Sequence, residues 1–165
     1  MIGVQNVIFA GLADGRLVAD LALRRDISRV IRQVRPDVII TQSPERRWNS
    51  VYGSHPDHLA AGEATMAAVY PDARNPHSHP ELLAEGLEPH TVPEIWVSGL
   101  EPEDVFIDIT DVFDRKCAAL GAHESQASER FKVEKLLRDW AGATTTRLGL
   151  PEGRLTEAYR RINAA

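Results

Sequence analysis

The chain has 165 residues, of which 43% are hydrophobic and 26% are charged, and its formal net charge is −5. This size and composition are those of one globular domain with its own core, and they exclude a disordered or fibrous chain. The negative charge and the absence of a basic run interleaved with aromatic residues argue against a general nucleic-acid-binding protein.

The single cysteine and the hydropathy indicate in which cellular compartment the protein works. Cys117 cannot form an internal disulfide, which suits a reducing cytoplasm, and its helical context favours a buried apolar residue over a nucleophile. We find no signal peptide and no apolar run of spanning length. We therefore expect a cytoplasmic protein that binds neither a membrane nor a nucleic acid. A homo-oligomer is compatible with the sequence.

The chain begins with a predicted strand and a polar loop. Residues 6–10 are a short apolar run, and residues 11–17 follow it with Asp14 and Gly15 as a turn pair. A strand that ends in such a loop is typical of the carboxyl edge of a parallel sheet, where ligands bind. Asp14 is therefore either an ordinary turn residue or a group placed to bind a substrate hydroxyl.

A predicted helix and a second predicted strand come next. Apolar residues recur at helical spacing over residues 23–34, arginines lie between them, and Pro36 ends the helix. Residues 37–42 are a compact β-branched apolar run, as in a buried strand. The order strand, helix, strand predicts a right-handed βαβ unit.

The polar loop after that strand leads into a His-Pro-Asp-His motif at residues 55–58. Pro56 suits the first position of a helix, and the residues after it favour helix. His55 and His58 then lie on neighbouring faces of one turn, where free backbone N–H groups and the helix dipole favour negative charge. Such a turn can hold a metal, an anion or an oxyanion, and Asp57 between the histidines can orient an imidazole.

The rest of the chain predicts further short elements of the same class. They are an irregular excursion at 72–93, strands at 94–98 and 105–109, helices at 111–123 and 129–140 capped by Thr110 and Ser128, and an amphipathic segment at 155–162. Because no repeat or linker is present, we expect residues 1–165 to form one α/β domain.

Two histidines do not complete a catalytic zinc site, which usually takes three protein ligands and leaves one position for water. Further ligand candidates within the chain are Asp14 and His123, neither of which has diagnostic spacing. In isolation, the two motif histidines are equally compatible with a functional site and with a structural role in which one caps a loop and the other is exposed. We expect three other histidines to be solvated surface residues rather than ligands: His77, His79 and His90.

Three arginines lie on the two predicted strand-end loops: Arg16, Arg46 and Arg47. Their guanidinium groups suit a phosphate or a carboxylate. Solvated surface charge explains them more simply, and we favour that interpretation for the group as a whole.

The chain resembles the LmbE-like, or PIG-L, family of zinc-dependent N-deacetylases, which act on N-acetylglucosamine-type and related amides. The resemblance is carried, in the family's order, by residues 11–17, 35–41, 53–62 and 116–126. The His-Pro-Asp-His element is the most specific of these stretches. The family's fold implies a Rossmann-like, mostly parallel sheet flanked by helices.

The resemblance also implies roles for residues of the motif. His58 would be a zinc ligand, and His55 would stabilise the oxyanion of the tetrahedral intermediate or protonate the leaving amine. Tyr52 would help to polarise the amide carbonyl, although its spacing to His55 is one residue longer than the family's pattern. Asp57 would orient its neighbours.

The resemblance further implies a small acetylated amino sugar as the substrate and zinc-bound hydroxide as the nucleophile that attacks its acetyl carbonyl. Asp14 corresponds to a residue that binds a sugar hydroxyl. We add Arg16, on the same loop, as a second candidate for substrate binding.

One departure from the family pattern concerns the metal. Members of the family begin with a strand and a His-Pro-Asp-Asp motif that supplies two zinc ligands and a carboxylate base, and no such motif occurs here. We therefore expect an N-terminally incomplete domain that lacks its first strand, in which His58 alone does not retain zinc tightly and activity is in question. The alternatives are a non-catalytic module that binds a sugar or small molecule, and a remnant completed by a partner chain.

Overall fold

The computed structural model describes residues 2–48, 51–125 and 130–165. These residues form two compact units, in which strands β3 (Val105–Asp108) and β4 (Thr156–Asn163) take part in both. The smaller unit comprises Met1–Phe9 and Phe106–Ala158, and the larger unit comprises Ala10–Val105 and Tyr159–Ala165.

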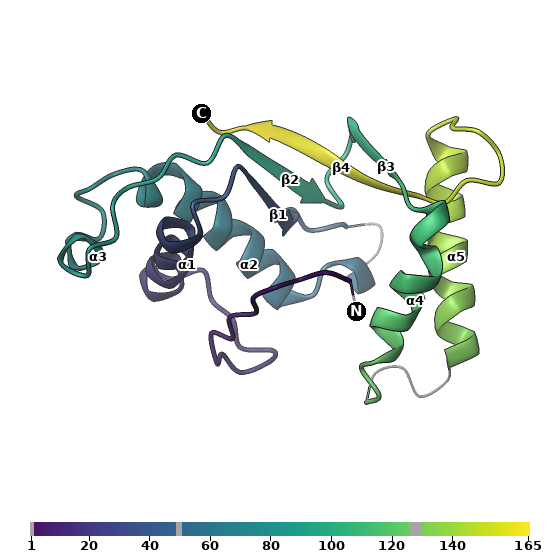
Figure 1. The fold of residues 1–165 in the computed structure, drawn as a ribbon, viewed down its shortest axis with the longest axis horizontal. Helices are drawn as coiled ribbons and strands as arrows, with labels where there is room; N and C mark the ends of the chain where they lie inside the picture. The colour runs from purple at the N-terminus through teal and green to yellow at the C-terminus, as the bar shows by residue number, and fades with distance from the viewer. Residues whose placement is uncertain (1, 49–50, 126–129) are drawn as a thin grey trace. The chain divides into compact units, whose positions relative to one another are not determined.

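A mixed sheet of strand order β1-β2-β4-β3 confirms the predicted α/β class (Figure 1). Strands β1 (Val38–Gln42) and β2 (Glu94–Ser98) pair in parallel. Strand β4 pairs antiparallel with β2, with Glu94 opposite Asn163. The sheet is thus less parallel than expected, because the amphipathic segment predicted at 155–162 is the antiparallel strand β4.

The strand predicted at residues 6–10 is wrong, since these residues have no regular structure. Val7, Ile8 and Phe9 are 67%, 59% and 89% exposed. A strand is stable only when its backbone groups pair with a neighbour, and an apolar composition does not supply that neighbour. The predicted βαβ unit therefore does not form from this segment, and the parallel connection is the one between β1 and β2.

Helix α1 (Leu21–Val34) follows the sequence signals closely. The Asp20 side chain accepts a hydrogen bond of 2.8 Å from the backbone N–H of Leu23, as an N-cap residue does. Arg35 ends the helix in the left-handed conformation with φ of 52°, directly before Pro36. The prediction that Pro36 ends this helix is confirmed.

The remaining helices are short, apart from α5. In chain order they are η1 (Val51–Gly53), α2 (Pro56–Ala67), the π-helix η2 (Ala68–Ala73), α3 (Pro80–Ala84), η3 (Thr110–Val112), α4 (Phe113–Gly121) and α5 (Arg130–Arg147). Among the described helices, none combines the length and the apolar character that crossing a membrane requires.

The helix cap predicted at Thr110 is wrong. Its hydroxyl donates to the Asp108 carboxylate and accepts from the backbone N–H of Leu155 at 3.0 Å, so it joins two segments of the smaller unit. The cap predicted at Ser128 lies outside the described residues. Cys117 is half-buried against the core of this unit, where burial raises the pKa of its thiol.

Each unit has its own apolar core. In the larger unit, α1, η2 and β2 bury their apolar faces together, and the core residues are Ile31, Ala68, Val69, Ala73, Val92, Ile95 and Val97. In the smaller unit the core residues are Ile109, Phe113, Leu137, Ala141 and Leu155.

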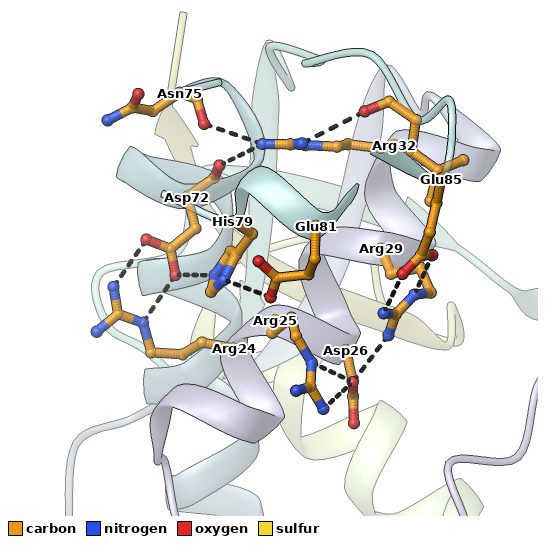
Figure 2. Close-up of polar contacts among 11 residues, drawn as sticks. Arg24, Arg25, Asp26, Arg29, Arg32, Asp72, Asn75, His79, Glu81 and Glu85 are labelled. Carbon is orange, nitrogen blue, oxygen red and sulfur yellow. Dashed lines mark hydrogen bonds and ion pairs between the residues drawn. The ribbon is translucent and has the colours of Figure 1, made fainter. Parts of the chain in front are cut away.

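Arginines of α1 fix the excursion that follows α2 (Figure 2). Arg32 is only 2% exposed, and its guanidinium donates to the backbone carbonyls of Asp72, Ala73 and Asn75 at 2.9 to 3.1 Å and to that of Leu87 at 3.3 Å. Three of these carbonyls also accept a backbone hydrogen bond: Asn75 donates to that of Asp72 at 3.3 Å, His90 to that of Ala73 at 3.0 Å and Ser78 to that of Asn75 at 3.2 Å. The buried cation therefore adds to these bonds and joins the end of η2 to the backbone that follows it.

Two histidines of the excursion are structural, which corrects the expectation that they are solvated. His79 is 8% exposed, and its Nε2 lies 3.3 Å from the Asp72 carboxylate, which also accepts two hydrogen bonds from Arg24 (Figure 2). The half-buried His90 has its Nε2 2.9 Å from the carbonyl of Pro36. His77 is exposed, as expected.

Candidate active site

The His-Pro-Asp-His motif forms the start of α2, as predicted. Pro56 is the first helical residue, and His55 is the N-cap. The Nδ1 atom of His55 accepts a hydrogen bond of 3.2 Å from the backbone N–H of Asp57. A neutral imidazole that accepts at Nδ1 carries its proton at Nε2, so His55 presents an N–H donor to its surroundings.

His58 lies one turn further on, with its ring centroid 5.4 Å from that of His55 and the ring planes tilted by 48°. It lines a pocket of about 220 Å³ in the larger unit. The other lining residues are Gln42, Ser43, Glu45, Arg47, Gly53, Ser98 and Gly99. Because Gln42 and Ser98 are paired at the carboxyl ends of β1 and β2, the pocket lies at the sheet edge where α/β proteins bind ligands.

Asp57 points to the loop that precedes α1. Its carboxylate accepts hydrogen bonds from the backbone N–H groups of Gly15 at 2.6 Å and Leu17 at 3.1 Å. Desolvation acts to raise the pKa of Asp57, but these N–H donors outweigh it and hold the pKa below its ordinary value. Asp57 is therefore ionised at neutral pH and ties this loop to the start of α2.

The structure places the two substrate-binding candidates on this loop, outside the His58 pocket. Asp14 is exposed and lies close enough to Asp57 to affect its pKa. Arg16 is also exposed, and its backbone N–H donates to the carbonyl of Ala13 at 3.3 Å within the turn. Tyr52 belongs to η1, and its side chain lies outside the described residues.

Close packing of α2 against the end of β1 sets the shape of the pocket. A Cβ atom at Gly62 would lie 2.4 Å from the carbonyl oxygen of Gln42 and 2.9 Å from the nitrogen of Pro44. Only glycine allows this approach. Ser54, which is 1% exposed, orders the neighbouring loop because its hydroxyl accepts from the backbone N–H of Arg47 at 2.8 Å.

Sequence reasoning did not single out most of the residues that line the pocket. A usable signal was their position, since Ser43 follows β1 directly and Gly99 follows β2. Arg47 was recognised only as one of several loop cations.

The donors of the described residues do not complete a zinc site. Across residues 2–48, 51–125 and 130–165, no group of three or more His, Cys, Asp or Glu residues is arranged to hold a metal ion. His58 faces the pocket, while the Asp57 carboxylate is bound to backbone N–H groups. His123, a further ligand candidate, belongs to the smaller unit. The zinc that the resemblance implies therefore does not fit these donors alone.

The fold and the site define a class: an α/β protein with a His-Pro-Asp-His turn beside a polar pocket at the sheet's carboxyl edge. The sequence pattern of the PIG-L family, described as GlcNAc-PI de-N-acetylase, matches residues 1–69. The chain belongs to this family.

Two curated relatives agree with this assignment. A "Probable N-acetyl-alpha-D-glucosaminyl L-malate deacetylase 2" of Bacillus cereus is 34% identical over 129 residues, which cover 76% of this chain and 52% of the relative. A diacetylchitobiose deacetylase of Thermococcus kodakarensis is 32% identical over 129 residues, covering 78% of this chain and 46% of the relative. The chain thus spans about half the length of these relatives.

A solved structure extends the similarity to the fold. The N,N'-diacetylchitobiose deacetylase from Pyrococcus horikoshii, complexed with its inhibitor MPG, matches with a TM-score of 0.84 and 25% identity. The match covers 98% of this chain and 59% of that chain.

Proposed function

We propose that this chain carries the substrate pocket of an amide hydrolase that removes the acetyl group from an N-acetylglucosamine-type compound. The observation that carries the proposal is the placement of His58 in a pocket at the carboxyl ends of β1 and β2. The names of the relatives, a glucosaminyl malate deacetylase and diacetylchitobiose deacetylases, support the same reaction.

In this reaction water adds to the acetyl carbonyl, the carbon–nitrogen bond breaks, and acetate and a protonated amine leave. Negative charge grows on the carbonyl oxygen as the tetrahedral intermediate forms. His55 is suited to stabilise that charge, because its cap hydrogen bond leaves the proton at Nε2. His55 then acts as a hydrogen-bond donor to the oxyanion, and the leaving amine receives its proton from another group.

Zinc is the metal that the family resemblance implies, and the described donors do not complete a site for it. The proposal therefore rests on the protein groups. His58 contacts the acetyl end of the substrate. Asp57 holds the loop of residues 13–17 against the start of α2 through its two hydrogen bonds to backbone N–H groups. Asp14 and Arg16 on that loop are proposed to bind sugar hydroxyls from outside the pocket.

The test is the release of free amine from N-acetylglucosamine conjugates, measured with and without a metal chelator. We expect release to fall by about 100-fold or more in His55→Ala, the loss typical of one oxyanion donor, and to a similar extent in His58→Ala. His77→Ala is the matched control, because this exposed histidine does not line the pocket. Equal activity in all three variants would contradict the proposal.

A second candidate is a non-catalytic module that binds an amino sugar without hydrolysing it. The incomplete set of metal donors among the described residues favours it. Metal analysis of the pure chain separates the two candidates, because stoichiometric zinc would count against a binding module. Sugar binding with no amine release under any metal condition would support it.

A further inference from the structure

We propose that Arg47 makes the His58 pocket selective for amino-sugar amides that also carry an anionic group, either a carboxylate or a phosphate. This inference rests on the proposed function for the location of the substrate. It goes beyond it by naming the class of substrate that the pocket prefers.

The first argument is that the Arg47 side chain is held in place along the pocket wall. Its Nη2 atom donates to the carbonyl of Gly99 at 3.0 Å, while its backbone N–H is bound by the buried Ser54. A glycine lies on each side of it. A Cβ atom at Gly53 would lie 3.6 Å from its Cδ, and one at Gly99 would lie 3.2 Å from its Nη2.

The second argument is that most of the hydrogen-bonding capacity of Arg47 is left for a ligand. A guanidinium has five N–H donors, and the Gly99 carbonyl takes one of them. Across the described parts of the chain, no carboxylate forms an ion pair with Arg47. By contrast, many other arginines have such a partner: Arg24, Arg25, Arg29, Arg138, Arg154, Arg160 and Arg161.

The third argument is that the rest of the pocket suits a hydroxylated ring. Glu45 offers carboxylate oxygens that accept from hydroxyl groups, and Ser43 and Ser98 also line the pocket. Because Glu45 repels a second anion, the charged group of the ligand belongs on the side of Arg47 and Gly99. The planar guanidinium of Arg47 can bind a carboxylate or a phosphate there with two parallel hydrogen bonds.

Binding measurements by calorimetry or ligand-detected NMR test the inference without requiring turnover. Three probes are compared: neutral N-acetylglucosamine, N-acetylglucosaminyl malate as the carboxylate, and N-acetylglucosamine 1-phosphate as the phosphate. We expect at least one anionic probe to bind about tenfold more tightly than the neutral one, and its identity separates the two anion sources.

Variants locate the effect. Arg47→Gln should bring the anionic probe to the affinity of the neutral one, and Arg47→Lys should restore part of the preference because it keeps the charge but not the fork. Arg46→Gln is the matched control, since this neighbouring exposed arginine does not line the pocket. It should keep the full preference.

The outcomes separate this inference from the proposed function. If neither anionic probe binds more tightly than the neutral one, or if Arg46→Gln and Arg47→Gln lose the preference equally, the inference is overturned. A preference that depends on Arg47 in a chain that releases no amine upholds the inference and counts against the hydrolase. Amine release without any preference for an anionic probe supports the hydrolase and overturns the inference about Arg47.

Discussion

Two groups of arginines in the larger unit differ in what their guanidinium groups bind. On α1, Arg24 and Arg29 are paired with carboxylates, and the buried Arg32 is bound by backbone carbonyls (Figure 2). At the pocket, Arg47 has one carbonyl partner and an exposed side chain. A satisfied arginine contributes to the fold, whereas an arginine with free donors beside a pocket is available to a ligand.

The largest effect is expected for Arg32→Met, which keeps much of the side-chain length but removes every donor. Four carbonyls of the excursion would lose their hydrogen bonds from the buried guanidinium, so we expect the free energy of unfolding to fall by about 3 kcal/mol. The urea midpoint measures this loss, with an unchanged m-value as evidence that the folded state is the same.

The control for Arg32→Met is Arg35→Met, which removes one exposed hydrogen bond to the carbonyl of Pro89. It should shift the midpoint by much less. If the two variants are destabilised equally, burial of the guanidinium is not what makes the α1 arginines structural, and the contrast with Arg47 fails.

The next largest effect concerns the scaffold of the pocket rather than its charge. In Gly62→Ala the added methyl group meets the backbone of Gln42 and Pro44, so α2 must move away from the end of β1. We expect a loss of about 1 to 3 kcal/mol in the free energy of unfolding, with weaker ligand binding in the pocket. Thermal or urea unfolding and sugar binding measure the two effects.

Gly142→Ala is the control for this substitution. Gly142 lies inside α5, and a Cβ atom there would meet nothing within 4 Å. An alanine should therefore stabilise the chain by about 0.5 to 1 kcal/mol through helix propensity. A Gly62→Ala variant as stable as the parent chain would show that α2 has room to move.

Local signals explain why some elements were predictable from the sequence. Helix α1 has apolar periodicity, an aspartate cap and a proline stop, and β1 has a β-branched run bounded by turns. The start of α2 was fixed by Pro56 within the motif. In each of these elements the determining residues lie within a few positions of one another in the chain.

Long-range contacts explain what the sequence did not show. Residues 6–10 resemble β1 in composition, yet only β1 has a partner strand. Thr110 resembles a cap, but its hydroxyl is used by Asp108 and Leu155, which is 45 residues away. The pocket was hidden for the same reason, since Arg47 and Gly99 meet only after β1 and β2 have paired.

A smaller, pH-dependent effect is expected for Asp57→Asn. Because the pKa of Asp57 is held below its ordinary value, its ionised form stabilises the folded chain at neutral pH. This stabilisation is complete above the carboxyl's pKa in the unfolded chain and is lost as the pH falls through the lower pKa of the folded state. Between about pH 6 and pH 3 the melting temperature should therefore fall more for the parent chain than for the variant.

The control for the acid effect is Asp139→Asn, on the exposed surface of α5, where the carboxylate is paired with Lys135. It should keep the acid dependence of the parent chain. Amide exchange at Gly15 and Leu17 gives a second measurement, because both N–H groups lose the charge of their acceptor in Asp57→Asn. Unchanged exchange at both positions would mean that this carboxylate does not hold the loop.

The smallest effect on stability is expected for Arg47→Gln, and it is the most informative about the comparison. The variant loses one exposed hydrogen bond to Gly99, so its free energy of unfolding should stay within about 0.5 kcal/mol of the parent chain. If Arg47→Gln unfolds as readily as Arg32→Met, Arg47 is a structural residue like those of α1. If stability is kept while the preference for an anionic sugar is lost, the free donors of this side chain are explained by binding, since folding does not require them.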